Sequence, residues 1–406
     1  MSEKLTAVAE ELRSYDKKVQ LIYAFNGTGK TRLSQAFKSL FDVERGDDDE
    51  PTEATVDPKI LYYSAFTEDL FYWDNESGPD GPKLKIQPNS FTDWILREQG
   101  QDRNVITTFQ RYTNNKLTPR FNAARQGNLP SAFGENASPT IKAFSEVTFS
   151  IESGDDSKST NLKISKGEES NFIWSLFYAL LELVIETRAE VKPDFPTPTP
   201  FDRLEYVFID DPVSSLDDNH VIQVAVDIAE IIKSDKSDIS FIITTHNPLF
   251  FNVLCNEFRR NYKSHRYNWN VRSFKKYRLE KSEDGTLNLK EQLNDSPFSY
   301  HLYLISQLQE AIKTGQVERY HFNLLRNVLE KTATFLGYSR WEQLLSKTVD
   351  GSPNPVATRI MDFSSHSKHA AEEMSQLTPE LKEVLARLVN ELVEHYRFFQ
   401  PGTEEK

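Results

Sequence analysis

The sequence predicts an α/β domain over residues 1–290, followed by an all-helical domain over residues 291–406. In the first part, two apolar stretches at 206–209 and 240–244 bracket an amphipathic stretch at 218–232. This order of strand, helix and strand favours a parallel sheet covered by helices. In the second part, apolar residues recur with a helical period. Helices are expected there at residues 302–312, 317–336 and 379–399.

The remaining elements of the α/β part follow from local patterns. A short buried strand is expected at 20–24 and a long, mostly apolar helix at 169–188. A β-hairpin is expected from 147–151 and 162–164, because a Gly-Asp-Asp turn sequence lies between them. Acidic residues without apolar periodicity predict a solvated loop over 44–58.

Bulk composition narrows the classes of protein. The chain has 406 residues, a net charge of −13 and a single cysteine. The low cysteine count fits a reducing cytosol, and no apolar run reaches the about 18 residues of a membrane helix, so a cytoplasmic protein without membrane contact is expected. The negative charge argues against an extensive nucleic-acid-binding surface. Residues 256–290 are an exception, with ten Lys and Arg against four Asp and Glu, which fits either solvated strands or a phosphate-facing edge.

A glycine-bearing loop follows the first expected strand. Residues 24–31, Ala-Phe-Asn-Gly-Thr-Gly-Lys-Thr, match the Walker A pattern except for alanine in place of the first glycine. Such a loop binds phosphates with backbone N–H groups, while its lysine reaches the β- and γ-phosphates and its hydroxyl binds Mg²⁺. Thr31 is therefore a predicted Mg²⁺ ligand. The residues of this loop expected to bind ATP or GTP are Asn26, Gly27, Gly29, Lys30 and Thr31.

A hydrophobic strand that ends in two carboxylates predicts the other half of the nucleotide site. Residues 206–211 read Tyr-Val-Phe-Ile-Asp-Asp, which fits the Walker B pattern. Asp210 is expected to hold Mg²⁺ through water, and Asp211 to polarise the water that attacks the γ-phosphate. Without a Walker A loop in the same chain, the two carboxylates would be interpreted as capping the turn that follows a strand.

Three further motifs indicate the ABC branch of P-loop NTPases. Residues 164–169, Ile-Ser-Lys-Gly-Glu-Glu, resemble the ABC signature, in which Ser165 and Gly167 would contact nucleotide. The sequence Ser-Ser-Leu-Asp, which ends at Asp217, resembles the D-loop. His246 follows the second apolar stretch and resembles the switch histidine, although a histidine at a strand end is more often structural.

One chain carries one nucleotide site, which has consequences for assembly. In ABC proteins the signature serine caps the γ-phosphate held by another subunit, so a nucleotide-dependent homodimer or a higher homo-oligomer is expected. Asp211 stands where a longer Glu is more usual, which predicts slow turnover suited to a gate. The Q-loop glutamine is not assigned, although Gln87 is a candidate, and nothing in the motifs selects a nucleotide base.

The motif sequences resemble one family in particular. Asn-Gly-Thr-Gly-Lys-Thr and Ser-Lys-Gly-Glu-Glu are similar to the Rad50 and SMC side of the ABC superfamily. The aromatic-rich segment 60–75, whose composition predicts a buried strand and an aromatic-lined loop, is similar to the box that marks the PrrC anticodon nucleases. The resemblance extends over nearly the whole chain. It implies a Rad50/SMC-like ABC-type NTPase domain joined to a helical nuclease domain.

The resemblance implies a ribonuclease site made of an Arg, a Glu four residues later and a His further on. The matching positions are Arg326, Glu330 and His366. Residues four apart share one helix face, so both head groups could meet one phosphate, and an imidazole can exchange protons near neutral pH. Such a site needs no metal and would leave a 2′,3′-cyclic phosphate and a 5′-hydroxyl. Without the resemblance, Arg326 and Glu330 would be an exposed ion pair and His366 an incidental histidine, and His369 is a competing choice.

The resemblance also implies a substrate, ligands and partners. The substrate would be tRNA-Lys, cut in the anticodon loop on the 5′ side of the wobble base, with Asp295 and Ser296 in its recognition. The family is held latent by a type I restriction–modification complex, is released by phage infection and acts in antiviral translational arrest. GTP hydrolysis and dTTP binding are controls in that family, so dTTP is a candidate regulatory ligand.

Two other functions are compatible with the motifs. One is a Rad50/SMC-like DNA-binding ATPase without nuclease activity, which would need a long coiled-coil insertion between Walker A and the signature. About 130 residues separate these motifs, without sustained heptads. The other is a signalling NTPase whose helical domain binds a partner. An assay for tRNA cleavage distinguishes the three functions.

Overall fold

The computed structural model divides the chain into two compact units, Met1–Pro297 and Phe298–Lys406. Among the described residues, no helix is long and apolar enough to cross a membrane. The structure describes residues 3–42, 58–64, 67, 69–75, 81–113, 115–126, 140–152, 158–159, 161–189, 201–264, 267–282, 286–292, 299–345 and 377–398.

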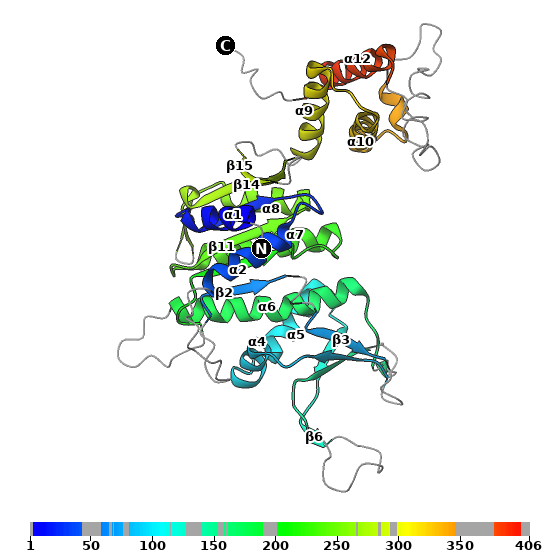
Figure 1. The fold of residues 1–406 in the computed structure, drawn as a ribbon. Coiled ribbons are helices and arrows are strands. Elements are labelled where there is room, and N and C mark those ends of the chain that lie inside the picture. Colours follow the sequence, from blue (N-terminus) through cyan, green and yellow to red (C-terminus); the bar gives the residue numbers. More distant parts are fainter. Residues whose placement is uncertain are drawn as a thin grey trace. The chain divides into compact units, whose positions relative to one another are not determined.

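A six-stranded sheet forms the centre of the first unit (Figure 1). Its strand order is β15-β14-β1-β11-β10-β2, and all neighbours run parallel except β14 and β15, which are antiparallel. The predicted strand–helix–strand unit is confirmed, because β10 and β11 are parallel neighbours on either side of helix α7 in the chain. The strands are β1 Val19–Tyr23, β2 Ile60–Tyr63, β10 Tyr206–Asp210, β11 Ser240–Thr245, β14 Phe274–Lys281 and β15 Leu287–Glu291.

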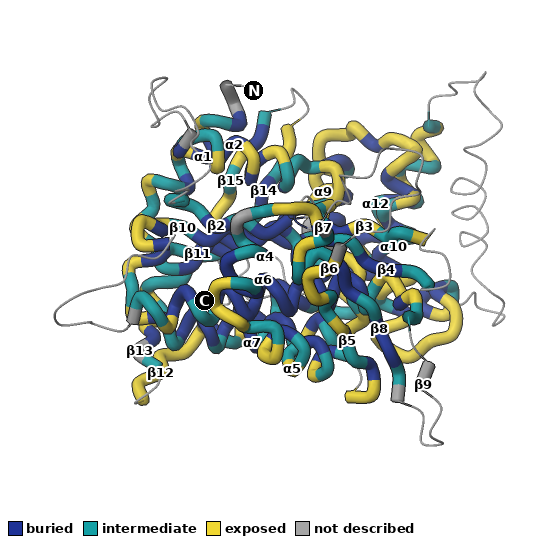
Figure 2. Tube along the Cα trace, turned by 90° about the horizontal axis from the view of Figure 1, so that it is seen from below, coloured by how far each residue is buried: buried dark blue, intermediate teal, exposed yellow. Residues whose placement is uncertain are grey.

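Helices cover both faces of this sheet. Alternate side chains of a strand point to opposite faces. In β1, Val19 and Leu21 therefore enter the core shared with α6, α7 and α8, whereas Ile22 enters the core shared with α1 and α2. The buried residues lie along the central strands and α6 (Figure 2). The helices are α1 Glu3–Ser14, α2 Lys30–Asp42, α6 Lys166–Ala189, α7 Asp218–Ser234 and α8 Pro248–Phe258.

A second, antiparallel sheet has the strand order β3-β4-β8-β5, and β9 pairs with β8. Its inner face joins the core that contains α6. Its strands are β3 Phe71–Asp74, β4 Lys83–Ile86, β5 Leu117–Phe121, β8 Glu146–Glu152 and β9 Lys158–Ser159. Other elements of the unit are α4 Ser90–Asp93, a π-helical turn Trp94–Glu98, α5 Asp102–Tyr112, the 3₁₀ turn Val271–Ser273, and the short pairs β6 Arg125–Gln126 with β7 Thr140–Ile141 and β12 Tyr262–Lys263 with β13 Asn268–Trp269.

Two predicted elements differ from the structure. The strand after β8 in the chain that pairs with it is β9, and not residues 162–164 as the predicted hairpin required. The Leu162 N–H donates a hydrogen bond to the Phe149 carbonyl oxygen (2.9 Å), but residues 162–164 do not form a strand. The chain turns there, because Ile164 is buried and α6 begins at Lys166. The aromatic segment 60–75 contributes strands to both sheets, β2 and β3, where one strand and a loop were predicted.

The basic stretch 256–290 includes two strands of the central sheet, β14 and most of β15. Strand β14 has β1 on one side and β15 on the other, and its Tyr277 and Leu279 are buried. Glu280 pairs with Lys290 (2.6 Å) and with Arg278. Lys275 also pairs with Glu291 (2.9 Å). Three cations of this stretch therefore have carboxylate partners within the same two strands, which fits the interpretation as solvated strands.

The second unit is helical, as predicted. Its helices pack on a common apolar core that includes Leu308, Leu325 and Leu388. All three predicted helices are present with shifted ends. The elements are α9 Ser299–Thr314, α10 Arg319–Phe335, the 3₁₀ turn Trp341–Leu344 and α12 Pro379–Tyr396.

Candidate functional site

The Walker A loop connects the buried strand β1 to helix α2. Gly27 and Gly29 have φ angles of 79° and 113°, which side chains other than hydrogen rarely permit. Apart from the two neighbours of Gly27 in the chain, no described residue has an atom within 4 Å of the position that a Cβ would occupy on this glycine. The loop thus has open space beside its backbone, as close approach of a phosphate requires.

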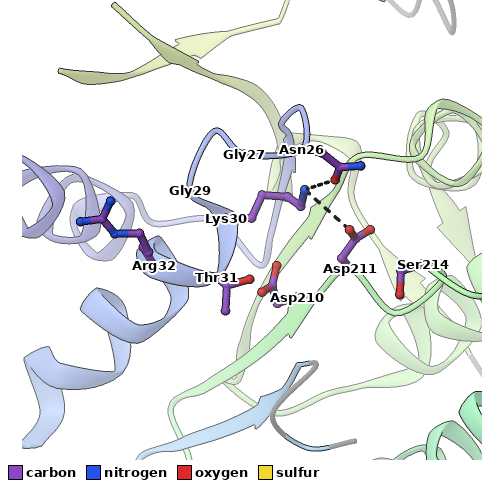
Figure 3. Close-up of a pocket in the computed structure, with 9 residues that line it drawn as sticks. All are labelled: Asn26, Gly27, Gly29, Lys30, Thr31, Arg32, Asp210, Asp211 and Ser214. Atoms are coloured by element: carbon purple, nitrogen blue, oxygen red, sulfur yellow. Dashed lines mark hydrogen bonds and ion pairs between the residues drawn. The ribbon is translucent and has the colours of Figure 1, made fainter. Parts of the chain in front are cut away.

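The ammonium of Lys30 is held inside this loop. Its Nζ atom lies 3.4 Å from the Ala24 carbonyl oxygen, 3.3 Å from Asn26 Oδ1 and 3.6 Å from Asp211 Oδ2. The side chain is 8% exposed, and it points toward Asn26 and Asp211 (Figure 3). The cation is therefore already desolvated and oriented by oxygen atoms before a phosphate arrives.

A cavity of about 390 Å³ lies in front of the loop. Its volume is above the about 300 Å³ at which pockets for small ligands begin. Two residues that line it, Arg32 and Ser214, had no predicted role. Arg32 directly follows the Walker A motif in the first turn of α2, and this position could have indicated it. Ser214 belongs to the D-loop sequence. The lining residues are Asn26, Gly27, Gly29, Lys30, Thr31, Arg32, Asp210, Asp211 and Ser214.

Thr31 and Asp210 face each other in this cavity (Figure 3). Burial raises the pKa of Asp210 above its usual value, although hydrogen bonds from Thr244 and Thr31 oppose the rise. Mg²⁺ is commonly held by one or two protein oxygens together with substrate phosphates and water. A hydroxyl and a carboxylate beside the phosphate space fit that ion, which would neutralise phosphate charge when bound.

Asp211 is the meeting point of the predicted site residues. Its φ angle is 53°, its Oδ1 accepts a hydrogen bond from Thr245 Oγ1 (3.1 Å), and its Oδ2 pairs with His246 Nδ1 and with Lys30. Burial raises the pKa of Asp211, but the hydrogen bond and charge of His246 and the charge of Lys30 outweigh burial and hold it below the usual value. Such a carboxylate stays charged near neutral pH, so it suits orienting a water better than accepting a proton.

The signature residues lie at the start of α6. The Glu168 N–H donates to Ser165 Oγ (3.3 Å) and the Ser165 N–H donates to Glu168 Oε2 (2.8 Å), so the serine caps the helix. A Cβ on Gly167 would lie 3.2 Å from the Ser215 carbonyl oxygen, which explains a glycine at this contact with the D-loop. Ser165 is exposed, and neither it nor Gly167 is among the described residues that line the cavity.

Two other predicted residues have local structural contacts. Asp217 caps α7, because its carboxylate accepts the N–H groups of Asn219 (3.1 Å) and His220 (3.2 Å). Gln87 follows β4, and its amide donates to the Asp69 carbonyl oxygen (3.4 Å). Neither residue is among the described residues that line the cavity.

The aromatic segment 60–75 contacts both ends of the nucleotide machinery, which the sequence did not indicate. The Tyr62 hydroxyl shares a hydrogen bond with Ser34 of α2, the helix that begins at Lys30. Trp73 Nε1 donates to Glu169 Oε2 (2.9 Å) in the signature sequence at the start of α6. The segment thereby joins the phosphate-binding helix to the signature helix within one chain.

In the helical unit, the predicted Arg and Glu of the nuclease motif are in contact. Arg326 Nε lies 2.7 Å from Glu330 Oε1, one turn further along α10, and the two side chains are 32% and 47% exposed. His366, Asp295 and Ser296 lie outside the described residues. The structure therefore places two of the three predicted catalytic side chains together on a solvent-facing side of one helix.

Comparisons with solved structures show distant similarity. An Smc head domain with a coiled coil and joint from Pyrococcus yayanosii is 13% identical with a TM-score of 0.29, and the match covers 51% of this chain and 29% of that chain. An SmcHead bound to the C-winged helix domain of ScpA is 12% identical with a TM-score of 0.33, over 68% and 90%. The SMC head domain from Thermotoga maritima is 14% identical with a TM-score of 0.28, over 69% and 92%. Scores this low support no argument about function.

Sequence comparisons identify the family. The AAA domain family matches residues 148–390, from β8 to α12. An anticodon nuclease from Escherichia coli is 48% identical over 393 residues, which cover 94% of this chain and 90% of that protein. Nearly half of the residues are thus identical over almost the full length of both proteins. The chain therefore belongs to the anticodon nuclease family, and it is an enzyme with an α/β ATPase domain and nuclease function.

Proposed function

We propose that the chain is a nucleotide-gated endoribonuclease that cuts tRNA-Lys in the anticodon loop on the 5′ side of the wobble base. Residues 1–290 form the NTPase domain, and residues 291–406 form the nuclease domain that it controls. One observation carries this proposal: the likeness to the E. coli anticodon nuclease covers 94% of the chain. So large a share includes most of the unit Phe298–Lys406 and not the ATPase part alone.

The proposed chemistry uses Arg326, Glu330 and His366 without a metal. The Arg326 guanidinium, which is partly exposed beside Glu330, binds the scissile phosphate and the charge that develops on it. One of the other two groups takes the proton of the ribose 2′-hydroxyl, and the other protonates the leaving 5′-oxygen. The 2′-oxygen bonds to phosphorus as the bond to the 5′-oxygen breaks. The products are a 2′,3′-cyclic phosphate and a 5′-hydroxyl, and Asp295 and Ser296 contact the tRNA.

The gate is an ATP or GTP molecule with Mg²⁺, bound by the Walker A and Walker B residues, with dTTP as a regulatory ligand. Nucleotide joins two or more copies of the chain, because Ser165 is exposed and lies outside the cavity of its own chain. Ser165 and Gly167 then contact the γ-phosphate held by the partner, with Asp217 and His246 beside them. Ser165→Arg should block nucleotide-dependent association in light scattering while nucleotide binding persists, and a wild type that stays monomeric with a nonhydrolysable nucleotide would contradict this assembly.

The biological role that we propose follows from the family resemblance. The enzyme acts in the cytoplasm in antiphage defence, and a type I restriction–modification complex keeps it silent. Release of the nuclease during infection would arrest translation. Co-purification of the chain with that complex, and its release on infection, are the observations that would support this role.

The test of the nuclease function is cleavage of end-labelled tRNA by the purified chain. Bulk tRNA and tRNA-Lys are incubated with the protein and nucleotide, the cut is mapped on a denaturing gel, and the termini are treated with phosphatase and kinase. A cut beside the wobble base with a cyclic phosphate end is expected. A 3′-hydroxyl product would falsify the mechanism, and intact tRNA under every nucleotide condition would leave the helical domain with a binding role.

A further inference from the structure

The outer face of the antiparallel sheet carries polar side chains that belong to none of the nucleotide-binding or nuclease motifs. Directly paired residues of neighbouring strands share a face, and alternate residues of a strand return to it. On the opposite face, Leu84, Val147 and Phe149 are fully buried in the core. The strand register therefore places the following residues together on the outer face: Tyr72, Lys83, Lys85, Arg120, Glu146 and Thr148.

Three cations, two on this face and Arg125 of strand β6, share one buried carboxylate. Glu146 is 4% exposed. Its carboxylate lies 3.0 Å from Arg125 Nη2 and 4.0 Å from Lys83 Nζ, and it also pairs with Lys85. The Lys83 side chain is 9% exposed, so water screens its charge poorly. Lys85 and Arg125 are more accessible, at 24% and 46%. One carboxylate cannot balance the charge of three cations, so binding of a further anion would stabilise the cluster.

Arg120 adds a fourth positive charge. It is exposed and forms no ion pair with any residue that the structure describes. Asp74 contributes a second carboxylate, 3.6 Å from Lys85 Nζ. The cluster remains positive on a chain whose net charge is −13, so it is the kind of local patch that attracts anionic ligands.

Three of these cations, Lys83, Arg120 and Arg125, line a cavity of about 270 Å³. This volume lies just under the about 300 Å³ at which pockets for whole small ligands begin. It suits one phosphate group and its water better than an entire nucleotide. The polar lining residues are Lys83, Arg120, Asn122, Arg125, Glu146 and Thr148.

We propose that this basic sheet face (Tyr72, Lys83, Lys85, Arg120 and Arg125) binds an unpaired segment of RNA, with one backbone phosphate in the cavity. Tyr72 favours nucleic acid over a free anion as the ligand. Its side chain is 52% exposed on the same face, and it lies opposite Lys85 in the register of β3 and β4. An exposed aromatic ring beside a cationic groove is the arrangement that stacks single-stranded bases. The choice of RNA rests on the proposed function, since tRNA has unpaired loops and ends.

Binding of RNA to the full chain tests this site independently of cleavage. The probe is a short fluorescent single-stranded oligonucleotide with 2′-O-methyl groups, which cannot form a cyclic phosphate, and its anisotropy is followed over a series of salt concentrations. Arg120→Glu should weaken binding and lower the slope of log Kobs against log salt by about 0.7, the value for one lost phosphate contact on a single strand. Tyr72→Ala should weaken binding by about fivefold or more without changing that slope, because stacking involves no counterion.

Arg103→Glu is the matched control, because Arg103 is an exposed arginine on α5 of the same unit. Thermal melting of each variant shows whether it is folded. Equal losses in Arg120→Glu and Arg103→Glu, or a weakening confined to duplex DNA, would overturn the inference. If the oligonucleotide binds through this face but no tRNA is cut, the nuclease proposal fails and this one stands. If tRNA is cut and Arg120→Glu binds like wild type, the reverse holds.

Discussion

Each unit of the molecule contains a contact between a cation and a carboxylate at a predicted site, and the two contacts differ in how they are built. Lys30 and Asp211 come from different elements, are 8% and 15% exposed, and are 3.6 Å apart. Arg326 and Glu330 lie four residues apart on one helix, are 32% and 47% exposed, and are 2.7 Å apart. The shorter contact is the more exposed one.

Burial gives the two contacts different roles. Lys30 and Asp211 lie where water screens weakly, and His246 and the left-handed backbone of Asp211 fix their geometry. A phosphate entering the cavity meets a cation that is already oriented. Arg326 and Glu330 lie at the surface of the helical unit and are partly exposed, and such a pair contributes at most about 1 kcal/mol. The electrostatic interaction of that pair with a substrate becomes strong only when a bound phosphate excludes the water.

The largest effect is expected at the residue that would complete the exposed pair. His366→Ala removes a proton carrier, and general acid–base catalysis typically contributes about 10²- to 10⁴-fold, so tRNA cleavage should fall by that range. His369→Ala is the matched control and should stay close to wild type. Both variants should hydrolyse ATP or GTP normally. Full cleavage by His366→Ala on a denaturing gel would show that the histidine is misassigned.

In the buried contact, Lys30→Ala should abolish nucleotide binding. Hydrolysis should fall by at least about 10²-fold, because removal of one preorganised hydrogen-bond donor from an active site typically has an effect of this size. The substitution also leaves Thr245 and His246 as the side chains that still contact the Asp211 carboxylate among the described residues. Lys38→Ala, an exposed lysine on the same helix, controls for the loss of charge. Calorimetric binding of nucleotide to Lys30→Ala at wild-type strength would argue against the cavity as the nucleotide site.

Asp211→Asn keeps the shape of the side chain and removes its charge. Nucleotide and Mg²⁺ should still bind, while hydrolysis should fall by about tenfold to a hundredfold, at or below the usual contribution of a general base, because the carboxylate orients water. Phosphate release measured at saturating nucleotide checks this. Unchanged turnover would mean that another group activates the water.

The same variant tests the lowered pKa of Asp211. A carboxyl whose pKa is lower in the folded state stabilises the fold fully above its unfolded pKa, which is about 3.9, and loses that contribution as pH falls through the folded pKa. The difference in free energy of unfolding between wild type and Asp211→Asn should therefore be larger at about pH 5 than at about pH 3. A difference that grows toward acid would have the wrong sign for the observed contacts.

The smallest effect concerns stability in the helical unit. Glu330→Gln should change the free energy of unfolding by under about 0.5 kcal/mol, because an exposed pair four residues apart on a helix contributes little. Glu391→Gln in α12 breaks a similar pair with Arg387 and should match it in urea unfolding. Cleavage should separate the two, falling at least about tenfold for Glu330→Gln alone. A large loss of stability in Glu330→Gln would indicate a structural role.

The sequence alone determined the features that depend on neighbouring residues. The Walker A loop is a strand, glycines and a helix in immediate succession, and the contact between Arg326 and Glu330 follows from the pitch of one helix. The helices of the second unit were found for the same reason, because their apolar residues repeat locally. His366 lies outside the described residues and stays a prediction.

Only the tertiary structure decided the contacts between distant segments. Lys30, Asp211 and His246 meet because β1, β11 and β10 are neighbours in the sheet, with their carboxyl ends at one edge. The bond from Trp73 to Glu169 and the cations around Glu146 likewise join residues far apart in the chain. The pairing of β8 with β9 was missed because a two-residue strand has no apolar period to detect. Local chemistry determines which residues can act, whereas strand order and packing determine which of them touch.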